Sequence, residues 1–212
     1  MVDVTLPHYL LSMSNLYIQS NIKITDNAVF TNGERSYFID GSNDLASFLK
    51  SVYKNFGIDY AKFYKMDLLS KLGFIAAELI LMNFDRTAIL PEQIALLIAN
   101  TSASLNTDEK YSQLMENAPS PSVFVYTLPN IVIGEICIRH NIKGENLFIV
   151  QNDFDSEFSC NYITGLFKNN DTKLCLTGWI EVNMDGNYLA DLFLISQTKT
   201  LLELNKINLK II

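Results

Sequence analysis

Residues 120–153 read SPSVFVYTLPNIVIGEICIRHNIKGENLFIVQND, and this stretch decides the fold. It combines a turn-rich opening, an apolar helix interrupted only by small residues, a Lys-Gly turn and a short apolar strand, Leu147–Val150. Helices that alternate with buried strands are typical of an α/β fold. Ligands of open α/β sheets bind beyond the carboxyl ends of the strands, so the residues after Val150 should carry any chemistry.

The helix within this stretch is predicted to run from Thr127 to Arg139. Thr127 is a suitable N-cap residue, and Pro129 costs little in a first turn, where the N–H groups lack helical partners. Gly134 lies in the middle of the helix, where glycine costs about 1 kcal/mol relative to alanine. We therefore expect a close backbone approach at Gly134.

Apolar runs elsewhere predict the rest of a five-stranded core sheet. Its expected strands are Ile18–Ile24, Ile94–Ile98, Leu147–Val150, Leu174–Thr177 and Leu189–Leu194. Helical spacing of apolar residues predicts a buried helix over Lys65–Asn83. The dipeptide Asp185-Gly186 predicts a hairpin. Ser36–Ile39 should be a short extended piece. The expected order, βαβαβαββ, indicates an α/β fold with a mixed, mostly parallel sheet between helices, in a single domain over residues 1–212. The tail, residues 198–212, should hold a helical turn and a final short strand.

The composition is that of an ordinary globular protein, with 49% hydrophobic and 18% charged residues among 212. The net charge of −7 argues against binding to nucleic acid, which needs a basic surface. The cysteines, Cys137, Cys160 and Cys175, show no metal or disulfide spacing, and reduced thiols are the default inside cells. The N-terminus lacks a basic signal region, and the most apolar run, Gly73–Met82, is shorter than a membrane span. We therefore expect a cytoplasmic, soluble protein that binds neither nucleic acid nor a membrane.

Acidic residues follow the strand Leu147–Val150. Asp153, Asp155 and Glu157 can stabilise the start of a helix through its dipole, or they can bind a metal ion together. Three neighbouring acids without a liganding loop favour the first interpretation. We therefore predict neither a metal site nor a cofactor.

Two further residues have a structural and a catalytic interpretation. Cys160 should lie about two turns beyond the start of that helix, as a small buried thiol rather than a nucleophile. His140 follows the last turn of the helix Thr127–Arg139, where a cation complements the helix dipole. For His140 a capping role is therefore favoured over catalysis.

Several motifs between residues 60 and 182 resemble, in the correct order, the β-ketoacyl-ACP synthases of the thiolase superfamily. These motifs are Lys65-Met66-Asp67 with Gly73 and Ala76-Ala77-Glu78, Pro121-Ser122-x-Phe124, Thr127-Leu128-Pro129-Asn130 with Gly134 and Ile138, Lys143-Gly144-Glu145-Asn146, and Thr177-Gly178-Trp179-Ile180-Glu181. The resemblance covers the N-terminal half of such an enzyme, and it implies one thiolase-like half.

The resemblance also implies that the chain cannot carry out the family's condensation alone. In the family the nucleophilic cysteine begins the helix after the Lys-Gly-Pro-Asn strand, a position that falls near Asp153 here. Neither His8 nor His140 matches a catalytic histidine of the family, so no catalytic residue is assigned. We interpret the chain as a catalytically inactive relative, a chain-length-factor-like subunit or scaffold in fatty acid or polyketide-type biosynthesis. The alternative is a 3-oxoacyl-ACP synthase-related enzyme that binds or transfers acyl groups at a site completed by a second chain.

By the same resemblance, the helix Thr127–Arg139 and the strand Leu147–Gln151 form the surface on which thiolase-fold halves and subunits pair. The interface residues that this implies are Thr127, Asn130, Gly134, Leu147, Phe148, Ile149, Val150 and Gln151. The expected assembly is a homodimer, or a heterodimer with a full-length ketosynthase. An acyl carrier protein is a further candidate partner.

Overall fold

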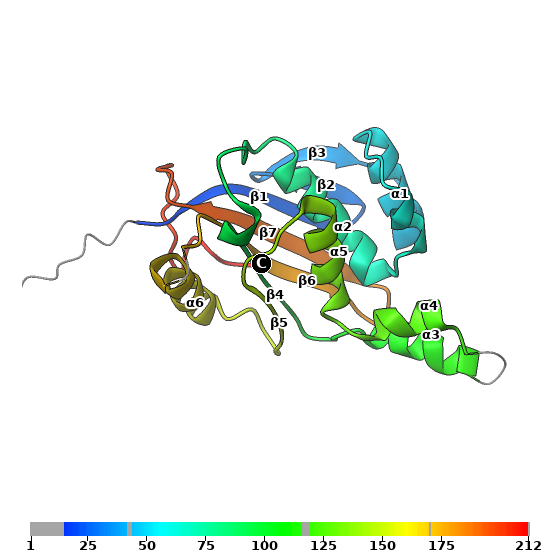
Figure 1. Cartoon of the computed structure of the whole chain (residues 1–212). Coiled ribbons are helices and arrows are strands. Elements are labelled where there is room, and N and C mark those ends of the chain that lie inside the picture. The colour runs from blue at the N-terminus through cyan, green and yellow to red at the C-terminus, as the bar shows by residue number, and fades with distance from the viewer. Residues whose placement is uncertain (1–14, 42–43, 116–118, 170, 212) are drawn as a thin grey trace, which may run out of the picture.

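The computed structural model describes residues 15–41, 44–115, 119–169 and 171–211 (Figure 1). These residues form one mixed sheet of seven strands in the order β3-β2-β1-β7-β6-β4-β5. The strands are β1 (Tyr17–Thr25), β2 (Ala28–Thr31), β3 (Glu34–Phe38), β4 (Ile94–Asn100), β5 (Asn146–Val150), β6 (Leu174–Val182) and β7 (Tyr188–Ser196). The predicted α/β fold, with a mixed sheet between helices, is confirmed, and all five expected core strands lie within observed ones.

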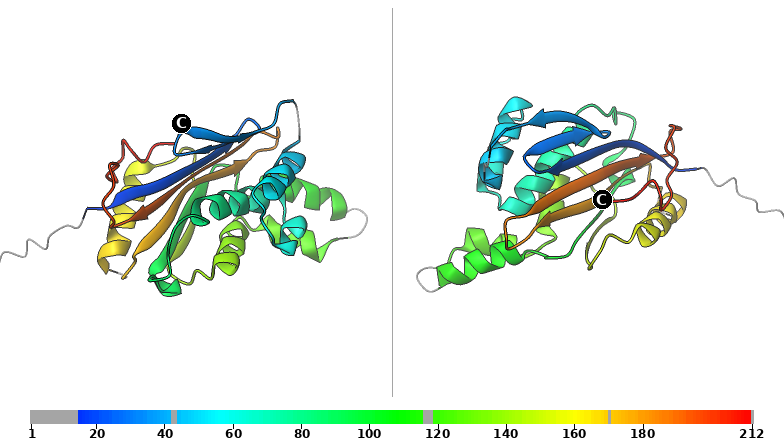
Figure 2. Two further views of the ribbon diagram at one scale, coloured as in Figure 1. Left: turned by 90° about the horizontal axis from the view of Figure 1, so that it is seen from above. Right: turned by 180° about the vertical axis from the view of Figure 1, so that it is seen from behind.

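Six α-helices and three short 3-10 helices accompany this sheet in the described residues. The α-helices are α1 (Leu45–Asn55), α2 (Leu68–Leu81), α3 (Leu105–Met115), α4 (Pro121–Phe124), α5 (Ile131–His140) and α6 (Ser156–Asn169). The 3-10 helices are η1 (Ala61–Lys65), η2 (Pro91–Gln93) and η3 (Val125–Thr127). α1, α2 and α5 cover one face of the sheet, and α6 lies on the other, as the opposite views in Figure 2 show.

The number of strands and their directions differ from the prediction. β4 is parallel to β5 and to β6, whereas the other four pairings in the sheet are antiparallel. The additional antiparallel strands arise because Asp26 and Asn27 both adopt positive φ angles, 48° and 55°, and turn the chain from β1 into β2. Positive φ at two central residues is the geometry of a tight hairpin, and this turn was not among the predicted ones. Residues 36–38 of the expected extended piece, 36–39, belong to β3, which pairs with β2.

The start of the helix in the deciding stretch also differs from the prediction. Thr127 ends η3 instead of capping α5, and its Oγ1 donates a hydrogen bond to the Phe124 carbonyl. Leu128 is extended, with φ −100° and ψ 114°, because the residue before a proline is disfavoured in the helical region. α5 therefore begins only at Ile131, after Pro129.

The close backbone approach occurs on α2 and not at Gly134. A methyl group added at Gly134 would have open space around it within 4 Å. At Gly73 of α2 the same group would collide with Val132 of α5, and it would lie 2.9 Å from Cδ1 of Ile180 on β6. Gly73 therefore lets α5 and the sheet pack tightly against α2, which is buried along almost its whole length.

The tail does not form the predicted final strand in the described residues. Glu203 makes a single antiparallel bridge to Tyr17, and a turn follows at residues 205–209. Leu209 is fully buried against the sheet face that α6 also covers. The tail thus contributes to the core from the side of the sheet opposite α2.

Candidate subunit interface

β5 forms one edge of the sheet. It pairs in parallel with β4, from Leu96 opposite Asn146 to Asn100 opposite Val150. Its other side pairs with no strand of the described chain. The three central residues are half-buried, and Val150 is 53% exposed.

The backbone of β5 presents hydrogen-bonding groups along this free edge. The Glu145 carbonyl accepts from Leu96 N–H, and Gln151 N–H donates to the Asn100 carbonyl, both at 2.9 Å. Since the backbone direction alternates along a strand, the N–H and C=O groups of Phe148 and Val150 point away from β4. Such a row is a template for the strand of another chain.

Apolar side chains flank the edge on both faces of the sheet. Phe148 packs with the cluster formed by α2, α5 and the sheet, whereas Leu147 and Ile149 pack with the cluster beneath α6. On α5, Ile138 is 66% exposed. β5 itself carries neither a charged side chain nor a proline that would hinder pairing.

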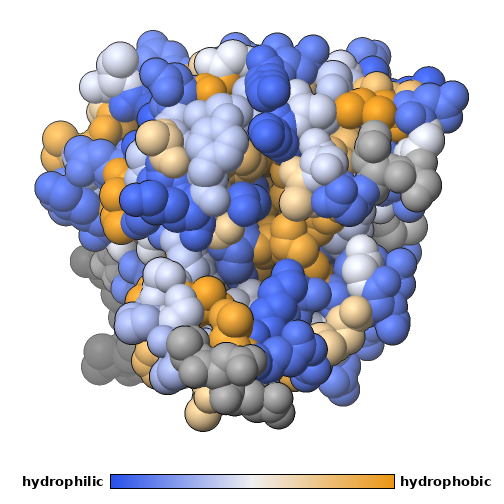
Figure 3. Space-filling view, turned by 90° about the vertical axis from the view of Figure 1, so that its right-hand side faces the viewer, coloured by the Kyte–Doolittle hydropathy of each residue, from blue (hydrophilic) through white to orange (hydrophobic). Residues whose placement is uncertain are grey.

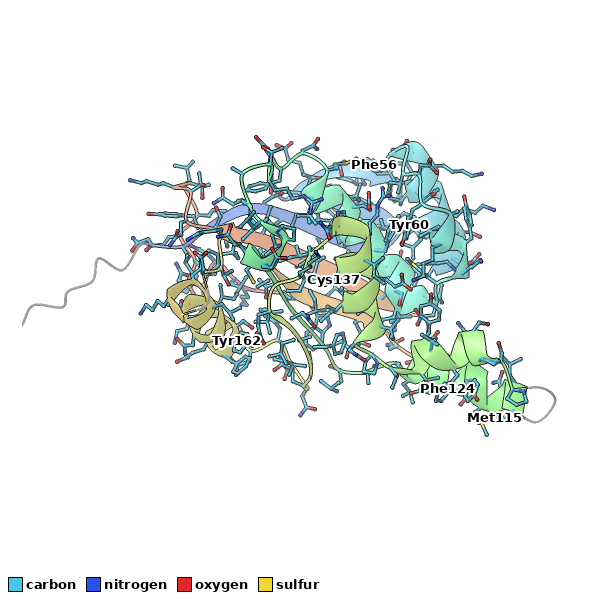
Figure 4. The ribbon with its side chains drawn as sticks, in the orientation of Figure 1. Phe56, Tyr60, Met115, Phe124, Cys137 and Tyr162 are labelled. Atoms are coloured by element: carbon cyan, nitrogen blue, oxygen red, sulfur yellow. The ribbon has the colours of Figure 1, made fainter. Side chains whose placement is uncertain are left out.

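A second apolar surface lies on the helical projection formed by α3, α4 and η3. This projection extends from the body of the molecule, and Met115 and Phe124 lie on it (Figures 1 and 4). Its large exposed hydrophobic residues are Leu105, Leu114, Met115, Phe124 and Val125. On the side of the molecule where α1 and the projection lie, apolar side chains show in a hollow surrounded by polar ones (Figure 3). Exposed apolar side chains that cluster on a folded chain are typical of interaction sites.

The projection is fixed to the body through its base. The Thr107 hydroxyl donates to the Asp67 carboxylate at 2.6 Å, which ties α3 to the start of α2. The Ser104 hydroxyl donates to the Thr127 carbonyl at 2.5 Å, which joins the two ends of the projection. Asp67 also caps α2 by accepting a hydrogen bond from Ser70 N–H. The exposed residues of α3 and α4 were not predicted to have a role, although Leu114 and Met115 stand out at the end of a mostly polar helix.

The carboxyl ends of β4, β5 and β6 are closed by internal hydrogen bonds. Glu181 accepts from the N–H groups of Thr101 and Ser102, at 2.7 and 3.2 Å. The Thr101 hydroxyl donates to the Asn152 carbonyl at 2.9 Å. Among the described residues, Nε2 of Gln151 and Oε1 of Glu181 are buried side-chain atoms without a hydrogen-bond partner. The N–H groups that could bind an anion here are therefore already occupied by Glu181.

Asp153 lies just outside this region, in a bend before α6. It is exposed, and α6 begins only at Ser156. Asp155 is the capping residue, because its Oδ1 accepts from Phe158 N–H at 2.8 Å. The expected helix-start acids are therefore Asp155 and Glu157, and Asp153 lies too far from the helix for this role. The described residues contain no group of three side chains arranged to hold a metal ion.

The three cysteines are poorly suited to act as nucleophiles. Burial raises the pKa of Cys137 and of Cys160 to about 11, and the pKa of Cys175 to about 12. A thiol must lose its proton to attack a carbonyl group, and these thiols stay protonated near neutral pH. Cys160 is only partly buried, whereas Cys175 is completely buried.

The predicted capping role of His140 is wrong. Its ring is buried between α5 and α2, where Nε2 lies 3.3 Å from Oε1 of Glu78 and Nδ1 lies 3.1 Å from Nη2 of Arg86. Burial lowers the pKa of His140 to about 4, so the ring is neutral near pH 7 and cannot complement the helix dipole as a cation. Arg139, the preceding residue, carries the charge and pairs with Glu78.

Among the described residues, no single helix is both long and apolar enough to cross a membrane. The segments Pro121–Thr127 and Ile131–His140 reach that length and composition only when they are joined across a bend of 100°.

Comparison of the sequence with protein-family models gives no match, and comparison with curated proteins gives none either. Several solved structures share the fold. The ishigamide ketosynthase/chain length factor superimposes with a TM-score of 0.62 at 16% identity, over 87% of this chain and 62% of that one. The ketosynthase ApeO in complex with its chain length factor ApeC, from Xenorhabdus doucetiae, gives 0.58 at 12% identity, over 86% of this chain and 79% of that one.

A β-ketoacyl synthase from Burkholderia phymatum gives a TM-score of 0.56 at 9% identity, over 86% of this chain and 59% of that one. The chain thus spans 62% of the length of the first of these structures. At these identities the likeness shows the fold alone, and the chain has the thiolase-like fold of the ketosynthases. The resemblance read from the sequence motifs is confirmed at this level.

Proposed function

We propose that this chain is a non-catalytic, chain-length-factor-like subunit that pairs with a ketosynthase in fatty acid or polyketide-type biosynthesis. The observation that carries the proposal is the uncharged, unpaired edge of β5, in a fold shared with ketosynthase and chain length factor structures. Pairing at this edge would extend the sheet into the partner and bury Phe148, Ile149 and Val150.

The chemistry of the chain supports a non-catalytic role. The exposed Asp153 stands near the position where the resemblance implies a cysteine, and a carboxylate does not provide the thioester chemistry of condensation. Burial raises the pKa values of the three cysteine thiols. We therefore expect acyl transfer to take place on the partner.

The α3–α4 projection gives the proposed pairing a second area of contact. Met115 and Phe124 are 60% and 52% exposed on a feature that extends away from the body. Aromatic and methionine side chains are enriched at protein interfaces. We propose that the projection packs against the same ketosynthase that pairs with β5.

An acyl carrier protein is a further proposed partner of the assembled complex. One of the fold neighbours is a type II polyketide synthase acyl-carrier protein in complex with its ketosynthase bound to the hexaketide, with a TM-score of 0.58. In the present chain the carrier protein would meet the heterodimer rather than the isolated subunit, because the reacting thiol belongs to the ketosynthase.

One observation favours a second candidate function, an acyl-binding enzyme completed by another chain. Nε2 of Gln151 and Oε1 of Glu181 are buried and without partners near the end of β5. A second chain that pairs with β5 could supply groups that complete a polar site there. Covalent labelling of the isolated protein by an acyl-ACP thioester, at Cys160 or elsewhere, would favour this function over the non-catalytic one.

The pairing is tested by co-expression with a ketosynthase from the same organism, followed by light scattering of the purified complex. Val150→Pro removes an N–H group that points away from β4, so the isolated variant should keep its thermal stability while it loses the complex. Lys168→Glu, on an exposed position of α6, is the control and should pair as well as the unmodified chain. Phe148→Lys should also abolish pairing, with a loss of solubility if its core contacts are essential.

Two outcomes contradict the proposal. A complex that survives Val150→Pro at full affinity would exclude β5 as the contact. A ketosynthase that never copurifies with the unmodified chain would exclude the heterodimer. In that case, light scattering of the chain alone separates a homodimer from a monomer at micromolar concentration.

A further inference from the structure

The tail after β7 returns across the sheet on the face opposite α2. Residues 198–211, here named the strap, follow the last strand and lie over the sheet when the molecule is seen from behind (Figure 2). The strap carries little regular secondary structure, yet it makes backbone, side-chain and core contacts with β1 and α6.

Backbone hydrogen bonds join the strap to the start of β1. Ile18 N–H donates to the Leu202 carbonyl at 2.8 Å, and Leu204 N–H donates to the Leu16 carbonyl at 2.7 Å. β2 pairs with β1 only from Ile22 onward, so the strap occupies the part of this edge that β2 leaves uncovered. The Thr200 hydroxyl adds a hydrogen bond to the Ile18 carbonyl at 2.9 Å.

The strap then places apolar side chains on the sheet face itself. Leu209 is 0% exposed and belongs to a core cluster with Ile18 and Phe193, while Leu204 and Ile211 pack at its margin. By contrast Ile207, two positions earlier, is 79% exposed. One side of the strap is therefore part of the core, and the other faces solvent.

Polar contacts fix the turn that directs Leu209 inward. The side-chain carbonyl of Asn205 accepts from the N–H groups of Ile207 and Asn208, and the Asn208 amide donates to the Glu203 carbonyl at 2.7 Å. Lys206 reaches Glu157 at the start of α6, with 3.1 Å between the charged atoms. The strap thus has a defined path from β1 to α6.

We propose that the strap is an intramolecular cap, which occupies an apolar sheet face that would otherwise need a second layer of structure. This face of β1 and β7 therefore binds the chain's own residues 198–211 and is closed to a partner protein. Subunit pairing is then left to β5 and the α3–α4 projection. The cap is inferred from the contacts of the strap alone, so it does not depend on the proposed pairing with a ketosynthase.

A matched pair of substitutions within the strap tests the cap. Leu209→Asp places a carboxylate in the apolar cluster, and Ile207→Asp places the same group on the exposed side. Hydrogen–deuterium exchange of the full-length protein should speed up at least tenfold in residues 15–19 and 198–211 for Leu209→Asp. In Leu209→Asp the exchange of β4 and β6 should stay unchanged. In Ile207→Asp the exchange should stay unchanged throughout the chain. Equal exchange in the two variants would overturn the proposal.

If Leu209→Asp does not yield soluble protein, a milder variant tests the cap. Thr200→Val removes the hydroxyl bonded to the Ile18 carbonyl and keeps the size of the side chain. Faster exchange in residues 15–19 would support the cap, and unchanged exchange would overturn it. Complex formation at β5, measured on the same variants, should persist, so a failure of the pairing proposal is distinguishable from a failure of the cap.

Discussion

A methyl group added at Gly73 should destabilise the protein, even though the residue lies inside a helix. Glycine in a helix interior ordinarily costs about 0.5–1 kcal/mol relative to alanine, so Gly→Ala would normally stabilise α2. At Gly73, however, the new Cβ would overlap Cγ2 of Val132 and lie 2.9 Å from Cδ1 of Ile180. The contact between α2 and α5 must then open, together with the contact between α2 and β6.

The size of the effect follows from the packing. Overfilling a close-packed core costs about 1–3 kcal/mol, which outweighs the gain of about 0.5–1 kcal/mol in helix propensity. Gly73→Ala should therefore lower the free energy of unfolding by about 1–2 kcal/mol. Val132 is only 1% exposed. Val132→Ala alone removes two buried carbon atoms, and the loss of each should lower the free energy of unfolding by about 0.8 kcal/mol. The double variant should lose about 1 kcal/mol less than the sum of the single losses, because the methyl group added on α2 fills the space that the shortened side chain leaves on α5.

Urea denaturation followed by circular dichroism measures all three variants. Gly134→Ala is the matched control, since this glycine also lies inside a helix but has open space where the added methyl group would lie. It should stabilise the protein by about 0.5–1 kcal/mol. Losses that add within about 0.5 kcal/mol in the double variant would refute the close contact of Gly73 with Val132.

Two further predictions concern single side chains. Asp155→Ala removes the carboxylate that accepts from Phe158 N–H and should lower the stability by about 1 kcal/mol, seen as a lower melting temperature with the fold unchanged. Burial lowers the pKa of His140 to about 4, so stability should fall as the pH drops from about 6.5, where the unfolded chain begins to take up this proton. Burial raises the pKa of Asp191 to about 6 from 3.8, so this carboxyl should make stability fall as the pH rises across that interval. Asp191→Asn should therefore steepen the gain in urea stability between pH 4 and 6.5, and an unchanged slope would contradict the raised pKa of Asp191.

Local patterns in the sequence located the core strands, but they did not show the neighbours of each strand. Leu147–Val150 and Ile94–Ile98 are both uncharged apolar runs, which predict strands covered on both faces. In the structure β4 lies between β5 and β6, whereas β5 lies at the edge. The order of strands depends on how the crossovers pack in three dimensions, and short sequence patterns do not encode it.

Long-range contacts also explain why the predictions for Gly134 and His140 were wrong. Gly73 and Gly134 have the same local sequence signal, and only the crossing of α2 with α5 distinguishes them. His140 meets Arg86, which is 54 residues away in the chain, so its burial was not visible from its place at a helix end. The hairpin at Asp26 and Asn27 could have been found, because both residue types tolerate positive φ better than most.

The two edges of the sheet differ in a way that supports pairing at β5. β3 carries Glu34 and Arg35, and its register with β2 shifts at a bulge, both of which discourage another strand from adding to it. The β5 edge carries no charge within the strand and keeps a regular register with β4 throughout. Folded proteins normally protect a free edge, so an edge without such protection is best explained by a partner that covers it. Since the strap already covers the free part of the β1 edge, we infer that a partner extends this sheet beyond β5.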